Sequence, residues 1–241
     1  MAVKKTSTAL SSRLAYFVAL VAVIYPLWQM FTSYQPKLYI FEPHKMQVLF
    51  EDALVKYPNS TAGAINHIVT SLRDTHGSKH ITVSPFPDEI SMQSGVSPYA
   101  DEWLFNNAGG AMGSMYLIHA SITEYLIIFG SSVGTEGHTG RHTADDYFHI
   151  LEGAQWAAAA HSLVMEEYPK GSVHHLRRGQ VKQYKMHKGC WALELAQGFI
   201  PGMLPFGFAD TFFSTLDVHT LWRTVYITGR EMIRNLLAGK I

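Results

Sequence analysis

An uncharged, mainly apolar run covers residues 14–31 and reads L-A-Y-F-V-A-L-V-A-V-I-Y-P-L-W-Q-M-F. At a helical rise of about 1.5 Å per residue, its length is close to the minimum for a bilayer span. Tyr25, Trp28 and Tyr34 near its far end are typical of the aromatic belt at a membrane surface. The pattern predicts a transmembrane anchor over residues 14–34. A cleaved signal peptide is the alternative, but no small-residue cleavage site follows the run.

Basic residues precede this run, since residues 1–13 contain Lys4, Lys5 and Arg13 and no acid. Because positive charge favours the cytoplasmic side of a membrane, we expect a single-pass protein with its N-terminus in the cytoplasm and its main domain on the lumenal side. Asn59 begins an N-S-T glycosylation acceptor. Its use depends on that topology, and the sequence leaves it open.

Two helices and an extended segment are predicted after the anchor. Apolar residues recur at helical spacing in two stretches of residues 41–76, separated by Pro58-Asn59-Ser60. Residues 78–101 are rich in Pro, Ser and Asp, as is typical of an extended connector. We therefore assign residues 35–102 to a helical and extended connector.

The pattern changes at Trp103, where short apolar runs separated by turn residues begin. Residues 115–120 and 125–129 read as paired strands. Residues 154–168 are ambiguous, because their alanines favour a helix whereas the flanking turn signals favour a strand. Closely spaced strands predict a small barrel or sandwich over residues 103–201.

Residues 202–241 have a helical pattern. Ser214-Thr215-Leu216-Asp217 fits a capping box before the second of two predicted helices. One side of that helix is apolar, with Leu221, Trp222, Val225, Ile233, Leu236 and Leu237. Cationic residues recur on another side, namely His219, Arg223, Arg230 and Arg234. Such a helix either lies in a membrane interface or packs on the domain, and the sequence leaves both possibilities open.

Candidate chemistry centres on Glu194, in the strand-like stretch W-A-L-E-L-A-Q-G-F-I-P of residues 191–201. Strand alternation puts the large apolar residues on one face and Glu194 on the other, between Ala192 and Ala196. Its small neighbours leave room for a guest molecule, and an apolar enclosure raises the pKa of a carboxyl group. A solvated glutamate on an edge strand is the alternative.

A second acid is available at Asp145 or Asp146, near the start of another candidate strand. Two carboxyl groups in one buried site share a proton, and such a pair can donate and accept protons on a hydrocarbon substrate. An Asp-Asp turn at the surface is the alternative.

Composition excludes several other classes of site. The net charge is zero and charged residues are 16% of the chain, so we expect no nucleic-acid partner. Cys190 is the only cysteine, which rules out an intrachain disulfide. The histidine pairs, such as His138 and His142 in a Gly-rich turn, lack the spacing of a metal motif. No metal and no cofactor are expected.

Several segments resemble the sterol isomerase and sigma non-opioid receptor family. They are Asn107-Ala108-Gly109-Gly110, His119-Ala120-Ser121, Gly137-His138-Thr139-Gly140-Arg141, the stretch 191–201 and Ala209-Asp210-Thr211. The resemblance runs from about Trp103 to residue 241, with the apolar run in the expected place. The stretch E-L-A-Q-G-F-I-P-G-M-L-P-F-G-F-A-D is most similar to the fungal branch of the family.

This resemblance implies an α+β fold in which a single N-terminal transmembrane helix precedes a cupin-like β-barrel. Two C-terminal amphipathic helices would close the barrel mouth and lie against the membrane. It also implies a homotrimer in the membrane of the endoplasmic reticulum.

The resemblance also implies roles for individual residues. Glu194 matches the essential glutamate of the ligand pocket, and an ungapped alignment puts Phe148 where the receptor branch has a partner aspartate. A nearby family acid matches Asp145, while Asp146 has the strand parity of Phe148, so the choice between the two aspartates stays open. The implied substrate-contacting residues are Met115, Tyr125, Phe129, Phe148, Ile200, Met203 and Leu204.

The implied activity moves a sterol ring double bond from position 8 to position 7, as in ergosterol-type biosynthesis, by protonation and deprotonation through a carbocation. A pocket built for a carbocation also suits a protonated amine, so cationic amphiphilic amines are the expected inhibitors. A non-enzymatic membrane receptor for such amines is the alternative.

Overall fold

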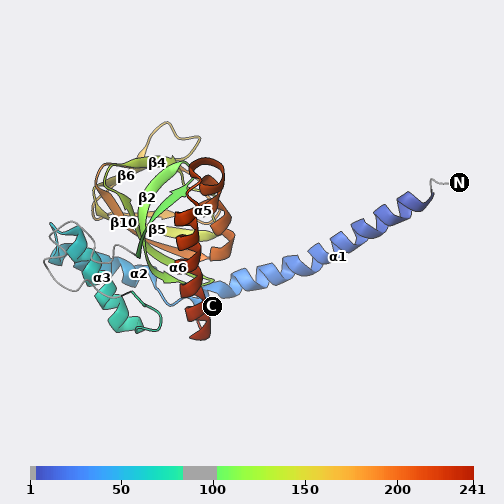
Figure 1. The fold of residues 1–241 in the computed structure, drawn as a ribbon, viewed down its shortest axis with the longest axis horizontal. Helices are drawn as coiled ribbons and strands as arrows, with labels where there is room; N and C mark the ends of the chain where they lie inside the picture. The colour runs from blue at the N-terminus through green and yellow to red at the C-terminus, as the bar shows by residue number, and fades with distance from the viewer. Residues whose placement is uncertain (1–3, 84–101) are drawn as a thin grey trace. The chain divides into compact units, whose positions relative to one another are not determined.

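The computed structural model describes residues 4–83 and 102–241, which divide into two units at residues 38 and 39. The first unit holds α1 (Lys4–Tyr34) and the short 3₁₀ helix η1 (Gln35–Leu38) (Figure 1). Its segment Ser12–Leu38 has a mean hydropathy of 1.8, and its most apolar part is not buried in the protein. The predicted N-terminal apolar helix is therefore confirmed, and it is long enough to cross a membrane.

The second unit begins with α2 (Pro43–Lys56) and α3 (Thr61–His76), which cover the two predicted helical stretches. Pro43 lies in the first turn of α2, where its missing N–H removes no helical hydrogen bond. Ser60 caps α3, because its Oγ accepts a hydrogen bond of 3.0 Å from the Gly63 amide. Most of the predicted extended connector lies outside the described residues.

Within the described residues, ten antiparallel strands form two sheets, which confirms the predicted α+β class. The larger sheet has the order β1 (Trp103–Ala108), β2 (Ala111–Ala120), β3 (Glu124–Ser131), β10 (Cys190–Gly198), β5 (Ala144–Glu152) and β8 (Val173–Leu176). The smaller sheet has the order β4 (Thr135–His138), β9 (Gln183–Met186), β6 (Ala154–Ala158) and β7 (Glu166–Pro169). The ambiguous stretch 154–168 therefore contains strands, because β6 pairs with both β7 and β9.

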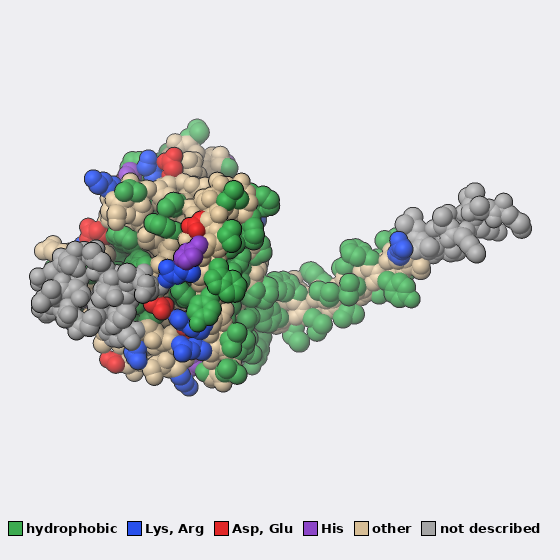
Figure 2. Space-filling model, viewed as in Figure 1, with side chains coloured by type: hydrophobic (Ala, Val, Ile, Leu, Met, Phe, Trp, Pro, Cys, Tyr) green, Lys and Arg blue, Asp and Glu red, His purple; other side chains and the backbone are tan. Residues whose placement is uncertain are grey.

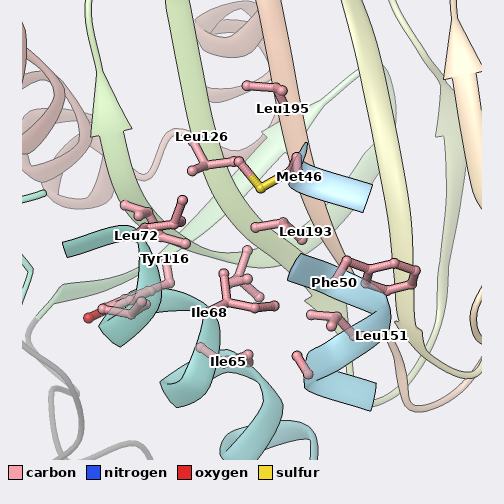
Figure 3. Packing of buried hydrophobic residues seen from close by; sticks show 14 of the residues in the cluster. Met46, Phe50, Ile65, Ile68, Leu72, Tyr116, Leu126, Leu151, Leu193 and Leu195 are labelled. Carbon is pink, nitrogen blue, oxygen red and sulfur yellow. The ribbon is translucent and has the colours of Figure 1, made fainter. Parts of the chain in front are cut away.

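The larger sheet is buried on both faces. On its outer face, Leu193 and Leu195 of β10 pack against α2 and α3, whose Phe50 and Ile68 are fully buried (Figure 3). On its inner face, smaller residues such as Ala192 line a second apolar cluster. Strands covered on both sides read as nearly continuous apolar runs, which explains the pattern of β3 and β10.

Helical segments follow β10 directly. They are the 3₁₀ turn η3 (Ile200–Gly202), α5 (Leu204–Asp210), the π-helix η4 (Thr211–Thr215) and α6 (Val218–Leu237). The predicted capping box is wrong, since Ser214 lies inside η4 and Leu216 has a positive φ of 53°. The cap of α6 is Asp217, whose carboxylate accepts a hydrogen bond of 3.1 Å from the Thr220 amide.

The predicted apolar side of α6 faces away from the domain. Trp222 and Leu237 are 68% and 84% exposed, whereas Ile227 and Met232 form part of the inner core. Phe213, in the π-helix before α6, is 89% exposed. Apolar side chains accordingly gather on the surface of the domain near α5 and α6 (Figure 2). This exposed side is what an interfacial helix presents to lipid.

Candidate active site

A cavity lies between the inner face of the larger sheet, the smaller sheet and the helices α5 and α6. The space not filled by protein atoms is about 990 Å³, including the part open to solvent. All of the predicted substrate-contacting residues line it: Met115, Tyr125, Phe129, Phe148, Ile200, Met203 and Leu204.

Glu194 lies at the middle of β10 and lines the cavity. It pairs with Ile127 of β3 on one side and Phe148 of β5 on the other, so these three side chains share the inner face. No described residue donates a hydrogen bond to its carboxylate. Burial raises the pKa of Glu194 to about 7, so the group can exist in both protonation states near neutral pH.

Asp146 is the diagonal neighbour of Glu194. It pairs with Ala196, two residues along β10, and is on the same inner face. Diagonal neighbours have Cα atoms roughly 7–8 Å apart, within reach of two carboxyl side chains. Asp146 is fully buried, and both its carboxyl oxygens lack a hydrogen-bond partner among the described residues. Burial first, and then the charge of Glu194, raise its pKa well above the usual value.

The two carboxyl groups therefore form a buried pair. An apolar environment disfavours their ionisation, and the close approach of like charges disfavours ionising both. The pair is expected to keep one proton between them near neutral pH. A site of this kind can give a proton to a substrate and take one back without a metal or a solvent molecule.

Asp145 is not brought to this site. Its side chain is on the opposite face of β5, where it accepts hydrogen bonds from His175 Nε2 at 3.1 Å and from the Arg178 amide at 3.2 Å. It is partly exposed. Of the two candidate aspartates, only Asp146 shares a face with Glu194, while Phe148 stands directly opposite Glu194.

Several polar residues on the cavity wall were not predicted from the sequence as site residues, and two of them are in contact with each other. Gln155 of β6 and His174 of β8 are almost fully buried, and His174 Nδ1 lies 2.7 Å from Gln155 Oε1. The strand parity of β8 was the available signal, since His174 pairs with Phe148 and therefore points inward.

Polar contacts from both C-terminal helices hold them on the domain. Asp210, the last residue of α5, accepts a hydrogen bond of 2.7 Å from the Gly110 amide in the turn between β1 and β2. The Tyr125 and Thr228 hydroxyl groups lie 3.3 Å apart and join β3 to α6. Within residues 4–83 and 102–241, no cluster of His, Cys, Asp and Glu has the form of a metal site.

These features define a class of protein: a chain with an apolar N-terminal helix, whose α+β domain has a cavity lined by one carboxyl group, Glu194, with the buried carboxyl group of Asp146 beside it. The chain belongs to the family described as ERG2 and Sigma1 receptor like protein, whose model matches residues 15–240.

Named relatives fall in two groups. A C-8 sterol isomerase of Pyricularia oryzae is 51% identical over 97% of this chain and 99% of its own length. One from Gibberella zeae is 54% identical over 85% of this chain and 80% of its own. A sigma non-opioid intracellular receptor 1 of Xenopus tropicalis is 38% identical over 70% of both chains.

Solved structures with a similar arrangement include the cupin domain of Cnp3 from Schizosaccharomyces pombe. It has a TM-score of 0.33 and 12% identity, and the match covers 38% of this chain and 69% of that domain.

Proposed function

We propose that this chain is an enzyme that moves the ring double bond of a sterol from position 8 to position 7, with Glu194 and Asp146 as its proton-transfer pair. The observation that carries the proposal is the pair itself: two carboxyl groups with raised pKa values on the inner face of the larger sheet, of which Glu194 lines the cavity. Relatives of about 50% identity named C-8 sterol isomerase support the same reading.

The proposed reaction adds one proton and removes another. Protonated Glu194 gives its proton to carbon 9, and the electron pair of the double bond forms the new C–H bond, which leaves a cation at carbon 8. Loss of a proton from carbon 7 to the carboxylate then forms the new double bond. Atoms and electrons balance within the substrate and the carboxyl pair, so no redox cofactor is needed.

Electrostatic attraction to the carboxylate stabilises the cationic intermediate. Once the proton has left, the cation faces ionised carboxylate in a site with little water, where charge attraction is stronger than in solvent. Asp146 lies behind Glu194 and does not line the cavity, so its role is to exchange the shared proton with Glu194. Asp145 faces away from the cavity and has no part in this scheme.

Sterol profiling of cells that lack their own isomerase tests the proposal. With the wild-type chain, 8-unsaturated sterols should decline and 7-unsaturated products should return. Glu194→Gln should fold but lose roughly 10²–10³ in turnover, as when one preorganised transition-state group is removed. Glu136→Gln, an exposed glutamate of β4, is the matched control and should behave as wild type. Wild-type turnover by Glu194→Gln would refute the assignment.

The same carboxyl pair is expected to bind protonated amines. A protonated amine resembles the cationic intermediate in charge, so cationic amphiphilic amines should compete with the sterol through Glu194. The receptor-named relatives make a binding protein without turnover the second candidate. Amine binding cannot separate the two candidates, whereas sterol turnover can.

The cellular setting is also proposed. The basic residues before the anchor favour a single pass with a cytoplasmic N-terminus and a lumenal barrel in the endoplasmic reticulum membrane. The exposed apolar side of α6 and the exposed Phe213 favour contact of the C-terminal helices with lipid. The homotrimer implied by the resemblance stays a prediction, which light scattering of the detergent-solubilised protein would check.

A further inference from the structure

Among the polar residues that line the cavity wall, Gln155 and His174 form a pair that is buried and joined by a hydrogen bond. Gln155 is 1% exposed and His174 is fully buried, and both line the cavity. A buried amide and a buried imidazole are costly unless each is hydrogen-bonded. Their hydrogen-bond partners therefore show which donor or acceptor this part of the cavity wall offers to a ligand.

The hydrogen bonds of His174 set its tautomer. Lys182 Nζ, which can only donate, lies 3.2 Å from His174 Nε2 and is ion-paired with Glu166. Nε2 must therefore accept, and a neutral imidazole then carries its proton on Nδ1. Burial first, and then the charge of Lys182, lower the pKa of His174 to about 4, so the ring is neutral at physiological pH.

The tautomer in turn sets the amide of Gln155. Nδ1–H of His174 donates to Gln155 Oε1 at 2.7 Å, so the amide oxygen is occupied. The amide nitrogen has no hydrogen-bond partner among the described residues, although the side chain is almost fully buried. This nitrogen is a donor on the cavity wall without an acceptor. A hydroxyl oxygen can accept from it, whereas a protonated amine has no lone pair to do so.

Strand pairing sets the distance between Glu194 and His174, the residue that accompanies the Gln155 donor. Glu194, Phe148 and His174 form one row across β10, β5 and β8. Neighbouring strands lie roughly 4.8 Å apart, so the Cα atoms of Glu194 and His174 are about 10 Å apart. In a sterol the hydroxyl group and the 8-position lie in adjacent rings, roughly 6 Å apart at carbon–carbon bonds of about 1.5 Å. Inward-pointing side chains at these two positions can therefore contact the 8-position and the hydroxyl group of one sterol at the same time.

The direction of β10 gives the orientation of the ligand. Its first residue, Cys190, lies against Gly153 in the turn that leads to Gln155. Its last residue, Gly198, leads directly into η3 and α5, whose Met203, Leu204 and other residues make an apolar wall. The donor and the apolar wall therefore lie toward opposite ends of the strand that carries Glu194.

We propose that Gln155 donates a hydrogen bond to the hydroxyl group of the sterol, and that His174 and Lys182 hold its amide in that orientation. The hydroxyl end then lies toward the start of β10 and the hydrocarbon tail toward α5 and α6. This inference rests on the proposed function for its ligand class. Gln155 is a specificity-determining residue, and His174 and Lys182 are positioning residues.

The test compares an 8-unsaturated sterol with its analogue lacking the 3-hydroxyl group, by equilibrium binding to the full-length protein in detergent. Wild type should bind the hydroxylated sterol about 10-fold more tightly, as expected for a buried hydrogen bond. Gln155→Leu should bind both sterols with the affinity that wild type has for the analogue. Gln47→Leu, an exposed position of α2, should keep the wild-type ratio.

A second pair of variants tests the positioning role. Lys182→Met should reduce the ratio of the two affinities, whereas Lys185→Met, which removes an exposed ion pair with Glu136, should not. A cationic amine without a hydroxyl group should bind all of these variants like wild type, which verifies that the cavity is intact.

Three outcomes would overturn the inference: a wild-type ratio near one, an unchanged ratio in Gln155→Leu (with or without an equal loss for both sterols), or no binding of either sterol. The wild-type ratio needs no variant to fold. Because this experiment measures binding and not turnover, its result can overturn this inference without overturning the proposed function. Hydroxyl discrimination without turnover would overturn only the proposed function, and turnover without discrimination would overturn only this inference.

Discussion

The buried carboxyl pair should make the folded protein less stable as pH rises. Burial raises the pKa of Glu194 from 4.5 to about 7 and raises that of Asp146 as well. Between the unfolded and folded pKa values, the folded state binds more protons than the unfolded state. Stability is therefore fully present at low pH and declines as pH rises through this window.

The size of the effect follows from the pKa values. For Glu194 alone, the change from 4.5 to about 7 corresponds to about 3 kcal/mol of lost stability. For a domain of this size, 1 kcal/mol shifts Tm by roughly 2–4 °C, so Glu194 alone should lower Tm by about 6–12 °C between pH 4 and pH 8. Asp146 adds to the change in the same direction.

Thermal unfolding of the detergent-solubilised protein, followed by circular dichroism, measures this dependence. Glu194→Gln removes one titrating group and the charge that acts on Asp146, so its Tm should fall less with pH. The double variant Glu194→Gln/Asp146→Asn should show the smallest dependence and should exceed wild type in Tm at pH 8. The exposed control Glu136→Gln should follow wild type. A wild-type Tm that is constant over this range, or a double variant that falls in parallel with wild type, would show that the pair is not held in a protonated state.

Three further predictions concern the scaffold. Leu193→Ala, in the core between the larger sheet and the helices, should cost about 2–5 kcal/mol of unfolding free energy by urea titration, with an unchanged m-value. Lys240→Met leaves the buried Glu124 carboxylate, now 3.0 Å from Lys240 Nζ, without its cation and should cost about 3–5 kcal/mol; Lys240→Met/Glu124→Leu should restore part of the loss. A fluorophore attached at position 222 should be quenched by brominated lipid, and one at the exposed Leu163 should not; equal quenching at both positions would contradict membrane contact by α6.

The face of Glu194 could be predicted from the sequence because it depends only on strand alternation. The choice between Asp145 and Asp146 could not, since adjacent residues point to opposite faces and the choice depends on the register of β5 against β10. The pairing of Ala196 with Asp146 decides it, and this pairing is a tertiary feature that no local pattern encodes.

Two other differences have similar causes. The alanines of residues 154–168 favour a helix locally, but pairing of β6 with β7 and β9 outweighs that preference. Gln155 and His174 belong to different sheets, so their contact arises only when the two sheets close around the cavity. A sequence pattern predicts each strand separately and contains no information about a contact between two sheets.

The two-sided burial of the larger sheet limits how the protein can be shortened for inhibitor screening or crystallisation. A fragment that starts at Trp103 would leave the outer apolar face of β3 and β10 without α2 and α3, and such a surface promotes aggregation. It would also leave Glu124 without the Ile40 and Phe41 amides, which donate to it at 2.7 and 3.1 Å. A shortened version should therefore remove only α1 and η1 and begin near Tyr39.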